Sequence, residues 1–176
     1  MTAAVTSEPP VHPALGPLGA LVGTWRGDGE GAYPTIERFR YVEELTFAHD
    51  GRPVLAYRQR TWDADSGAPL HAESGFLRGP ADGRAELVVA QPTGLVEAAV
   101  LHVSGGADDL VLAGERATLT RTPGARPVED VRRRFALHAG ALHVDLWMTF
   151  AGHVDTHHLH ATLLPIDPEE RGTDGR

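Results

Sequence analysis

The stretch DTHHLHATLL, residues 155–164, combines three histidines with residues that favour a β-strand. Side chains alternate along a strand, so His158 and His160 are expected on one face and His157 on the other. Three histidines within four residues are typical of a metal site. The same stretch also fits an edge strand with solvated imidazoles. The rest of the sequence has to decide between these two interpretations.

Strand-sized segments separated by turn residues extend outward from this stretch over most of the chain. We expect strands at 23–32, 36–48, 53–62, 70–78, 85–91, 95–103, 110–121, 131–137, 142–150 and 156–165. The breaks between them are rich in Gly, Pro, Asp and Ser, which favour turns. Ten short strands with tight connections predict an all-β fold. We expect a ten-stranded antiparallel up-and-down β-barrel of the calycin or fatty-acid-binding-protein kind, able to hold one small ligand.

The length of 176 residues fits a single domain, which we place at residues 13–166. Residues 13–22 carry apolar side chains at roughly helical spacing, interrupted by glycine and proline. They predict a short N-terminal helical cap of one or two turns. Residues 1–12 and 167–176 are expected to be a disordered leader and a disordered tail.

Composition excludes several classes of function. With 16 basic and 24 acidic residues the formal charge is -8, which disfavours nucleic acid and anionic membranes as partners. The chain has no cysteine, so disulfides, thiolate chemistry and covalent haem attachment through Cys are excluded. Neither a signal peptide nor a membrane-spanning segment is recognisable, and we expect a cytoplasmic protein. A homodimer is left open.

The last two strands can be aligned with each other. In 142–150 the even-numbered residues are all apolar, so this face is predicted to point into the barrel. A symmetric turn at 151–155 fixes the register between the two strands. The expected pairs are Phe150 with Thr156, Met148 with His158 and Leu146 with His160.

This register places His158 and His160 on the interior face and His157 outside. The apolar residues Leu159, Ala161 and Leu163, taken alone, favour the opposite assignment. We follow the pairing, because the alternation in 142–150 is cleaner.

The same alignment, continued one strand back, places Arg133 opposite Leu146 on the interior face. An inward guanidinium needs an anion, because an unpaired buried charge costs several kcal/mol. An inward Arg and His beside Met148 suggest an apolar, anionic, metal-containing ligand. Haem fits this description, with iron for the imidazole and a propionate for the guanidinium. The alternative is an arginine at the barrel rim with its head group in water.

The segment GTWRGDGEGAYPTI, residues 23–36, resembles the GxWxGxG signature and following YPTI of the nitrobindin family of haem-binding β-barrels. The resemblance continues through FRYVEE, residues 39–44, to the terminal His-Leu-His-Ala, and covers roughly residues 14–165. The glycines permit bends and close backbone approach where the barrel closes, and the tryptophan is expected to plug the barrel base. The signature residues are Gly23, Trp25, Gly27 and Gly29.

The resemblance implies a barrel that holds one non-covalent ferric haem b per chain through one axial histidine. That histidine is His158, which would be both the metal ligand and the catalytic residue. Thr35 and Arg133 are implied to contact the haem, and Met148 is expected beside it from the register. The implied activities are reversible binding of nitric oxide and isomerisation of peroxynitrite to nitrate. The flanking His157 and His160 depart from the family pattern and leave open which imidazole coordinates the iron.

One alternative function from a different class remains. A barrel of this kind could carry a lipid or another apolar metabolite without haem chemistry. A second catalytic set is not evident, because Glu43 and Glu44 are adjacent and therefore point to opposite faces of a strand.

Overall fold

Side chains alternate between buried and exposed along most strands of the computed structural model, which describes residues 9–167. In the strand Arg84–Ala90, for example, Ala85, Leu87 and Val89 are buried and the residues between them are exposed. A strand with one apolar face has to cover that face, and a sheet of such strands does so by curling around a common core.

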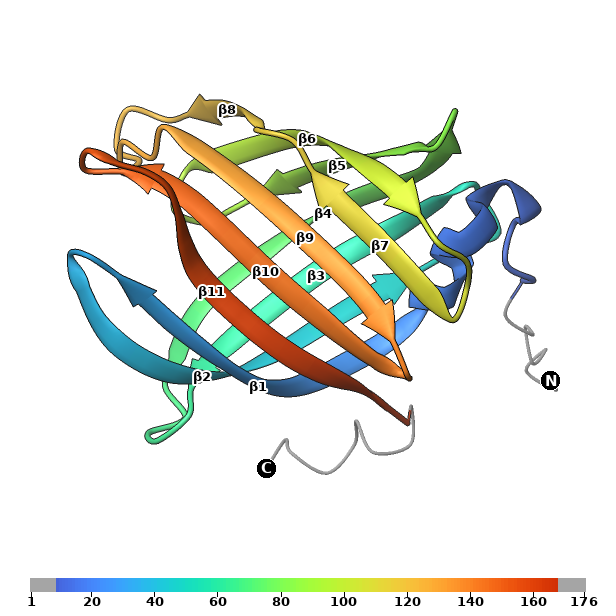
Figure 1. Cartoon of the computed structure of the whole chain (residues 1–176), viewed down its shortest axis with the longest axis horizontal. Coiled ribbons are helices and arrows are strands. Elements are labelled where there is room, and N and C mark those ends of the chain that lie inside the picture. Colours follow the sequence, from blue (N-terminus) through green and yellow to red (C-terminus); the bar gives the residue numbers. More distant parts are fainter. Residues whose placement is uncertain (1–8, 168–176) are drawn as a thin grey trace, which may run out of the picture.

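Ten strands close into one antiparallel barrel in the order β1-β2-β3-β4-β5-β6-β7-β9-β10-β11 (Figure 1). Nearly every strand therefore pairs with its neighbours in sequence, as predicted for an up-and-down barrel. The described residues form η1 (Pro13–Leu21), β1 (Gly23–Tyr33), β2 (Ile36–Ala48), β3 (Val54–Asp63), β4 (Pro69–Ala81), β5 (Arg84–Ala90), β6 (Leu95–Ser104), β7 (Asp109–Gly114), β8 (Thr118–Arg121), β9 (Asp130–His138), β10 (Ala141–Phe150) and β11 (His153–Ile166).

The predicted strand 110–121 is two strands in the structure. β7 pairs with β6 and β9 inside the ring, whereas β8 pairs only with the first residues of β6. The predicted disordered ends lie outside the described residues, apart from residues 9–12 and Asp167, so they stay predictions. The described part of the chain contains no helix long and apolar enough to cross a membrane.

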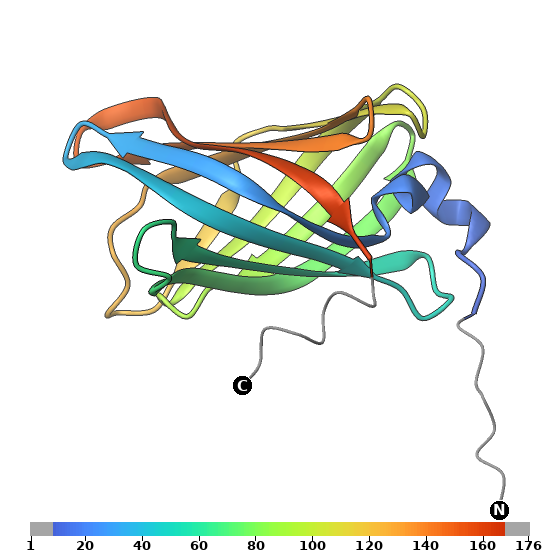
Figure 2. The ribbon, with the colours of Figure 1, turned by 90° about the horizontal axis from the view of Figure 1, so that it is seen from below.

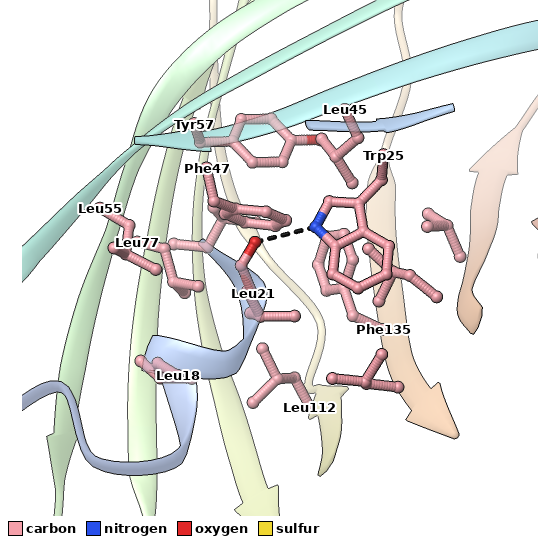
Figure 3. Close-up of a cluster of buried hydrophobic side chains, with 14 of the residues drawn as sticks. Leu18, Leu21, Trp25, Leu45, Phe47, Leu55, Tyr57, Leu77, Leu112 and Phe135 are labelled. Carbon is pink, nitrogen blue, oxygen red and sulfur yellow. Dashed lines mark hydrogen bonds between the residues drawn. The ribbon is translucent and has the colours of Figure 1, made fainter. Parts of the chain in front are cut away.

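The predicted N-terminal cap is the 3-10 helix η1, which lies at one end of the barrel (Figure 2). Its Leu15, Leu18 and Leu21 side chains are fully buried. Trp25 packs against this plug, and its indole N–H donates to the carbonyl oxygen of Leu21 at 2.8 Å (Figure 3). Trp25 therefore plugs the barrel base, as predicted.

The glycines of β1 allow the barrel to close between β1 and β11. A Cβ atom at Gly27 would lie 2.1 Å from the carbonyl oxygen of Thr162 on β11. A Cβ atom at Gly29 would lie 2.3 Å from the ring of Tyr41, which fills the space beside it. Gly27 thus allows the backbones of β1 and β11 to approach closely, and Gly29 leaves room for the inward ring of Tyr41.

The predicted register between β10 and β11 is wrong. Phe150 pairs with His153, Met148 with Thr156 and Leu146 with Leu159. The turn is the two-residue Ala151-Gly152, both with positive φ, as in the tight hairpin turns that match strand twist. The symmetric five-residue turn assumed from the sequence is therefore too long.

Two irregularities in β11 then shift the pairing further. One lies between the pairs of Met148 and Phe150, near Asp155, which has a φ of 42°. The other lies where Leu146 pairs with Leu159 but Trp147 pairs with His157, so His158 is an extra residue. A β-bulge of this kind changes the face to which a side chain points.

Arg133 on β9 crosses the barrel interior and is only 3% exposed. Its guanidinium lies 2.7 and 2.9 Å from the two carboxylate oxygens of Glu73 on β4, and 3.0 Å from those of Glu97 on β6. The Tyr57 hydroxyl donates to Glu73 at 2.6 Å. The predicted inward orientation is confirmed. The anions that pair with this guanidinium in the structure are the carboxylates of Glu73 and Glu97, so its charge is balanced without a ligand propionate.

We name Tyr57, Glu73, Glu97 and Arg133 the polar belt. Burial would lower the pKa of Arg133, but the two carboxylates raise it well above its ordinary value. Burial would likewise raise the pKa of Glu73, but the Arg133 charge and its hydrogen bonds lower it to about 2. Arg133 and Glu73 are therefore ionised, and the ion pairs of Arg133 tie β9 to β4 and β6.

Replacing the cation of the belt tests its contribution to stability. The Arg133→Met variant leaves two carboxylates buried without a cation, and its free energy of unfolding should fall by about 3–5 kcal/mol. The neighbouring Arg134→Met removes a half-buried guanidinium, 3.6 Å from Asp145 on the outer face, and should cost less than about 1 kcal/mol. Urea unfolding measures both variants. Equal losses would contradict the belt as a structural tie.

Candidate functional site

A cavity of about 730 Å³ occupies the end of the barrel opposite η1. It is lined at the start of β2, β4, β6 and β9 and near the end of β10. Apolar side chains form much of its wall, namely Ile36, Phe39, Leu70, Leu95, Val128, Val131, Leu146, Met148 and Leu159. Small-molecule sites are typically concave and mostly apolar, with volumes of roughly 300–1,000 Å³. The cavity has the size and lining of such a site.

His158 lines this cavity, because the bulge in β11 turns it away from the outer face. Its Nδ1 lies 3.0 Å from the carbonyl oxygen of Ala32, and a carbonyl can only accept. The proton must therefore be on Nδ1, which leaves the Nε2 lone pair free. Burial lowers the pKa of His158, against the opposite effect of the hydrogen bond to Ala32, and the neutral form is favoured.

Aromatic side chains hold the His158 ring in place. The rings of Tyr33 and Phe39 lie edge-on to it, with centroid distances of 5.4 and 6.3 Å. The Tyr33 hydroxyl also lies within 3.2 Å of the carbonyl oxygens of Met148, Phe150 and His153. Tyr33 thus fixes the β10–β11 hairpin against the end of β1. Sequence reasoning missed this role, although the tyrosine of YPTI was part of the resemblance.

His157 and His160 both lie on the outer face of the barrel. His157 Nε2 and His160 Nδ1 lie 3.1 and 2.8 Å from the same Asp145 oxygen, and both side chains are nearly half exposed. The predicted outward orientation of His157 is confirmed. The predicted inward orientation of His160 is wrong, because the register is shifted and His160 pairs with Asp145. The alternation of the apolar residues Leu159, Ala161 and Leu163 correctly indicated that His160 lies on the outer face.

Buried polar side chains form part of the inner cavity wall. Gln59, 5% exposed, donates from Nε2 to Glu43 at 3.0 Å. Its Oε1 is buried and has no hydrogen-bond partner among residues 9–167. Burial raises the pKa of Glu43 to about 7. Glu44 points outward to Arg26 and Arg60, which confirms that Glu43 and Glu44 occupy opposite faces.

The structure places the remaining predicted site residues as follows. Met148 and Arg133 line the cavity together with His158. Thr35 lies exposed in the turn between β1 and β2, and the cavity lining begins at the next residue, Ile36. Contacts of Thr35, Arg133 and Met148 with haem stay predictions.

Sequence reasoning missed the carboxylates of the polar belt. A signal for them exists in the alternation of the strands. Glu73 has the same parity as the buried Leu77 of β4, and Glu97 lies between the buried Leu95 and Ala99 of β6. An ionised glutamate at an apolar position of a barrel strand requires a buried cation, and Arg133 is the cation that the alternation places on the inner face.

These residues fit a haem group. The His158 imidazole has the tautomer that an axial ligand needs, with its other nitrogen held by a backbone carbonyl. The walls next to His158 are apolar, including Phe39, Met148 and Leu159. The described residues contain no group of three or more His, Cys, Asp or Glu arranged for a metal ion.

Comparisons with known proteins point to the same chemistry. Residues 14–164 match the family model described as "THAP4-like, heme-binding beta-barrel domain". The chain is 47% identical to "Peroxynitrite isomerase 1" of Rhodococcus jostii, over 89% of this chain and 87% of that protein. It is 41% identical to "Peroxynitrite isomerase" of Nocardia farcinica, over 93% and 98% of the two chains.

A solved structure is also similar. The crystal structure of Rv2717c from M. tuberculosis superposes with a TM-score of 0.85 at 36% sequence identity. The match covers 90% of this chain and all of that one.

The buried Glu43 predicts a pH dependence of stability. The folded protein keeps the Glu43 proton to about pH 7, whereas an ordinary glutamate titrates near 4.5. Between these values the folded state binds more protons than the unfolded state, so the free energy of unfolding falls as pH rises. Glu43→Gln removes this titrating group. The decrease in the free energy of unfolding between pH 5 and 8 should therefore be smaller than in the wild type by on the order of 2–3 kcal/mol.

Urea unfolding at several pH values measures this effect. Glu129→Gln makes the same change at an exposed position and should leave the pH profile as it is in the wild type. If the Glu43→Gln and wild-type profiles coincide, Glu43 ionises normally in the folded protein.

Proposed function

The chain belongs to the family of THAP4-like, haem-binding β-barrel domains, and on that premise we propose that it binds one ferric haem b and isomerises peroxynitrite to nitrate. The observation that carries the proposal is His158, whose Nδ1–H is held by Ala32 and whose Nε2 is free to bind a metal. The names of relatives that are 41–47% identical support the choice of reaction.

His158 would be the axial ligand. The hydrogen bond from Nδ1 to Ala32 keeps the ring in one tautomer and one orientation, and it increases the basicity of the ligating nitrogen. Tyr33 and Phe39 restrict rotation of the ring. Bound haem would supply a Lewis-acidic iron for the rearrangement of peroxynitrite.

The cavity walls would limit access of water to the reacting atoms. Phe39, Leu146, Met148 and Leu159 offer no proton donor next to His158. Isomerisation of peroxynitrite has no net proton transfer, so a general base from the protein is not needed. The same apolar site would accept nitric oxide, which we propose as a second ligand.

A His158→Ala variant tests the proposal. It should lose high-affinity hemin binding, seen as loss of the Soret band, and it should lose the isomerase activity. The other imidazole that lines the cavity among residues 9–167 is that of His71, and its Nε2 lies 3.3 Å from Glu73. The control is His160→Ala, which removes an outer-face imidazole 2.8 Å from Asp145 and should keep both properties.

Two results would contradict the proposal. Retention of the Soret band by His158→Ala would show that another residue ligates the iron. Failure of the wild-type protein to take up hemin at all would favour a barrel that carries a lipid or another apolar metabolite.

A further inference from the structure

Three arginines line the cavity, and they differ in how their charges are balanced. Arg133 is neutralised by the polar belt. Arg38 lies 3.5 Å from Glu30, with both side chains exposed. The Arg126 guanidinium makes no ion pair and no hydrogen bond with residues 9–167. Of the cavity-lining cations in the described chain, Arg126 is therefore the one with a free charge.

Arg126 lies on the loop between β8 and β9, and this loop is attached to the barrel at several points. The Thr122 N–H donates to the carbonyl oxygen of Gly94, and the Glu129 N–H donates to that of Thr149. The Arg121 guanidinium donates to the carbonyl oxygen of Val128 at 2.8 Å. The backbone that carries Arg126 is thus fixed at the cavity mouth, and a ligand there would order only its side chain.

The rest of the cavity is unfavourable for a negative charge. Glu37 and the ionised Glu73 also line it, and the polar belt holds two carboxylates for one guanidinium. The whole chain carries a net charge of -8. A ligand that is largely apolar but carries a carboxylate would be oriented with that group towards Arg126 and away from the belt.

We propose that Arg126 binds a carboxylate of the ligand held in this cavity and, on the proposed function, that this carboxylate is a haem propionate. The inference follows from the ion pairs of Arg133, whose charge is already balanced by Glu73 and Glu97. Arg126 then determines the orientation of the macrocycle in the cavity, with the carboxylate edge of the macrocycle at the cavity mouth. A small anionic ligand would use the same chemistry, and the experiment separates the two.

The experiment compares the affinity of hemin with that of its dimethyl ester, in which both carboxylates are neutral. Arg126→Gln should weaken hemin binding by about two- to fivefold, as expected for an exposed ion pair, and should leave ester binding unchanged. The loss should shrink in about 1 M salt, where such charges are screened. Arg126→Lys should recover part of the affinity, since it keeps the charge.

The matched control is Arg58→Gln, which removes an exposed arginine of β3 that has no ion pair within residues 9–167 and does not line the cavity. It should change the affinity for neither compound. This control separates a local contact from the general effect of one fewer positive charge.

Three outcomes would overturn the assignment. Each presupposes that the wild-type protein binds hemin. One is that Arg126→Gln weakens the binding of hemin and of its ester equally, and another is that it weakens the binding of neither. The third is unchanged hemin affinity with weaker azide binding to the hemin-loaded Arg126→Gln protein, which would assign the cation to a small anion. If the wild-type protein takes up no hemin, the proposed function itself fails, and the propionate assignment fails with it.

Discussion

The ion pairs of Arg133 with Glu73 and Glu97 divide the barrel interior into two parts. On one side lies the apolar core, closed by η1 and by Trp25. On the other side lies the cavity with His158. A buried guanidinium with two carboxylates stabilises a fold less than well-packed apolar side chains of the same volume often do. Its place in the structure is at the inner end of the cavity, which Glu73 and Arg133 both line.

The second constraint is the bulge in β11. Strict alternation from Leu159 and Ala161 would place His158 on the outer face together with His160. The extra residue reverses this at one position, so a single imidazole enters the cavity while its two neighbours stay outside. Bulges often occur where a functional side chain has to be re-aimed. The hydrogen bond to Ala32 then fixes the tautomer, so the bulge and the backbone of β1 together make His158 fit to bind a metal.

Local patterns predicted much of the fold. Alternation and turn residues were sufficient for the barrel, the cap and the inward face of β10, because each depends on residues close in sequence. The β10–β11 register could not be obtained in this way. It depends on a two-residue turn and on two irregularities, and none of these changes the polarity pattern of the strands.

Prediction of the site was limited in the same way, because the site depends on contacts between residues that are distant in sequence. Arg133 was placed correctly on the inner face, but its partners lie 36 and 60 residues away on β6 and β4. Alternation within one strand cannot reveal which strands meet across a barrel. The free charge of Arg126 has the same origin, since it is recognisable only when the partners of the other cavity arginines are known.

The most direct test is a crystal structure of the protein reconstituted with hemin. We expect iron bound to Nε2 of His158, with Nδ1 still donating to Ala32 and with Arg133 still paired to Glu73 and Glu97. Iron bound to another residue would contradict the assignment of His158. A guanidinium of Arg133 that has left the two glutamates for a propionate would contradict the division of the interior by the polar belt.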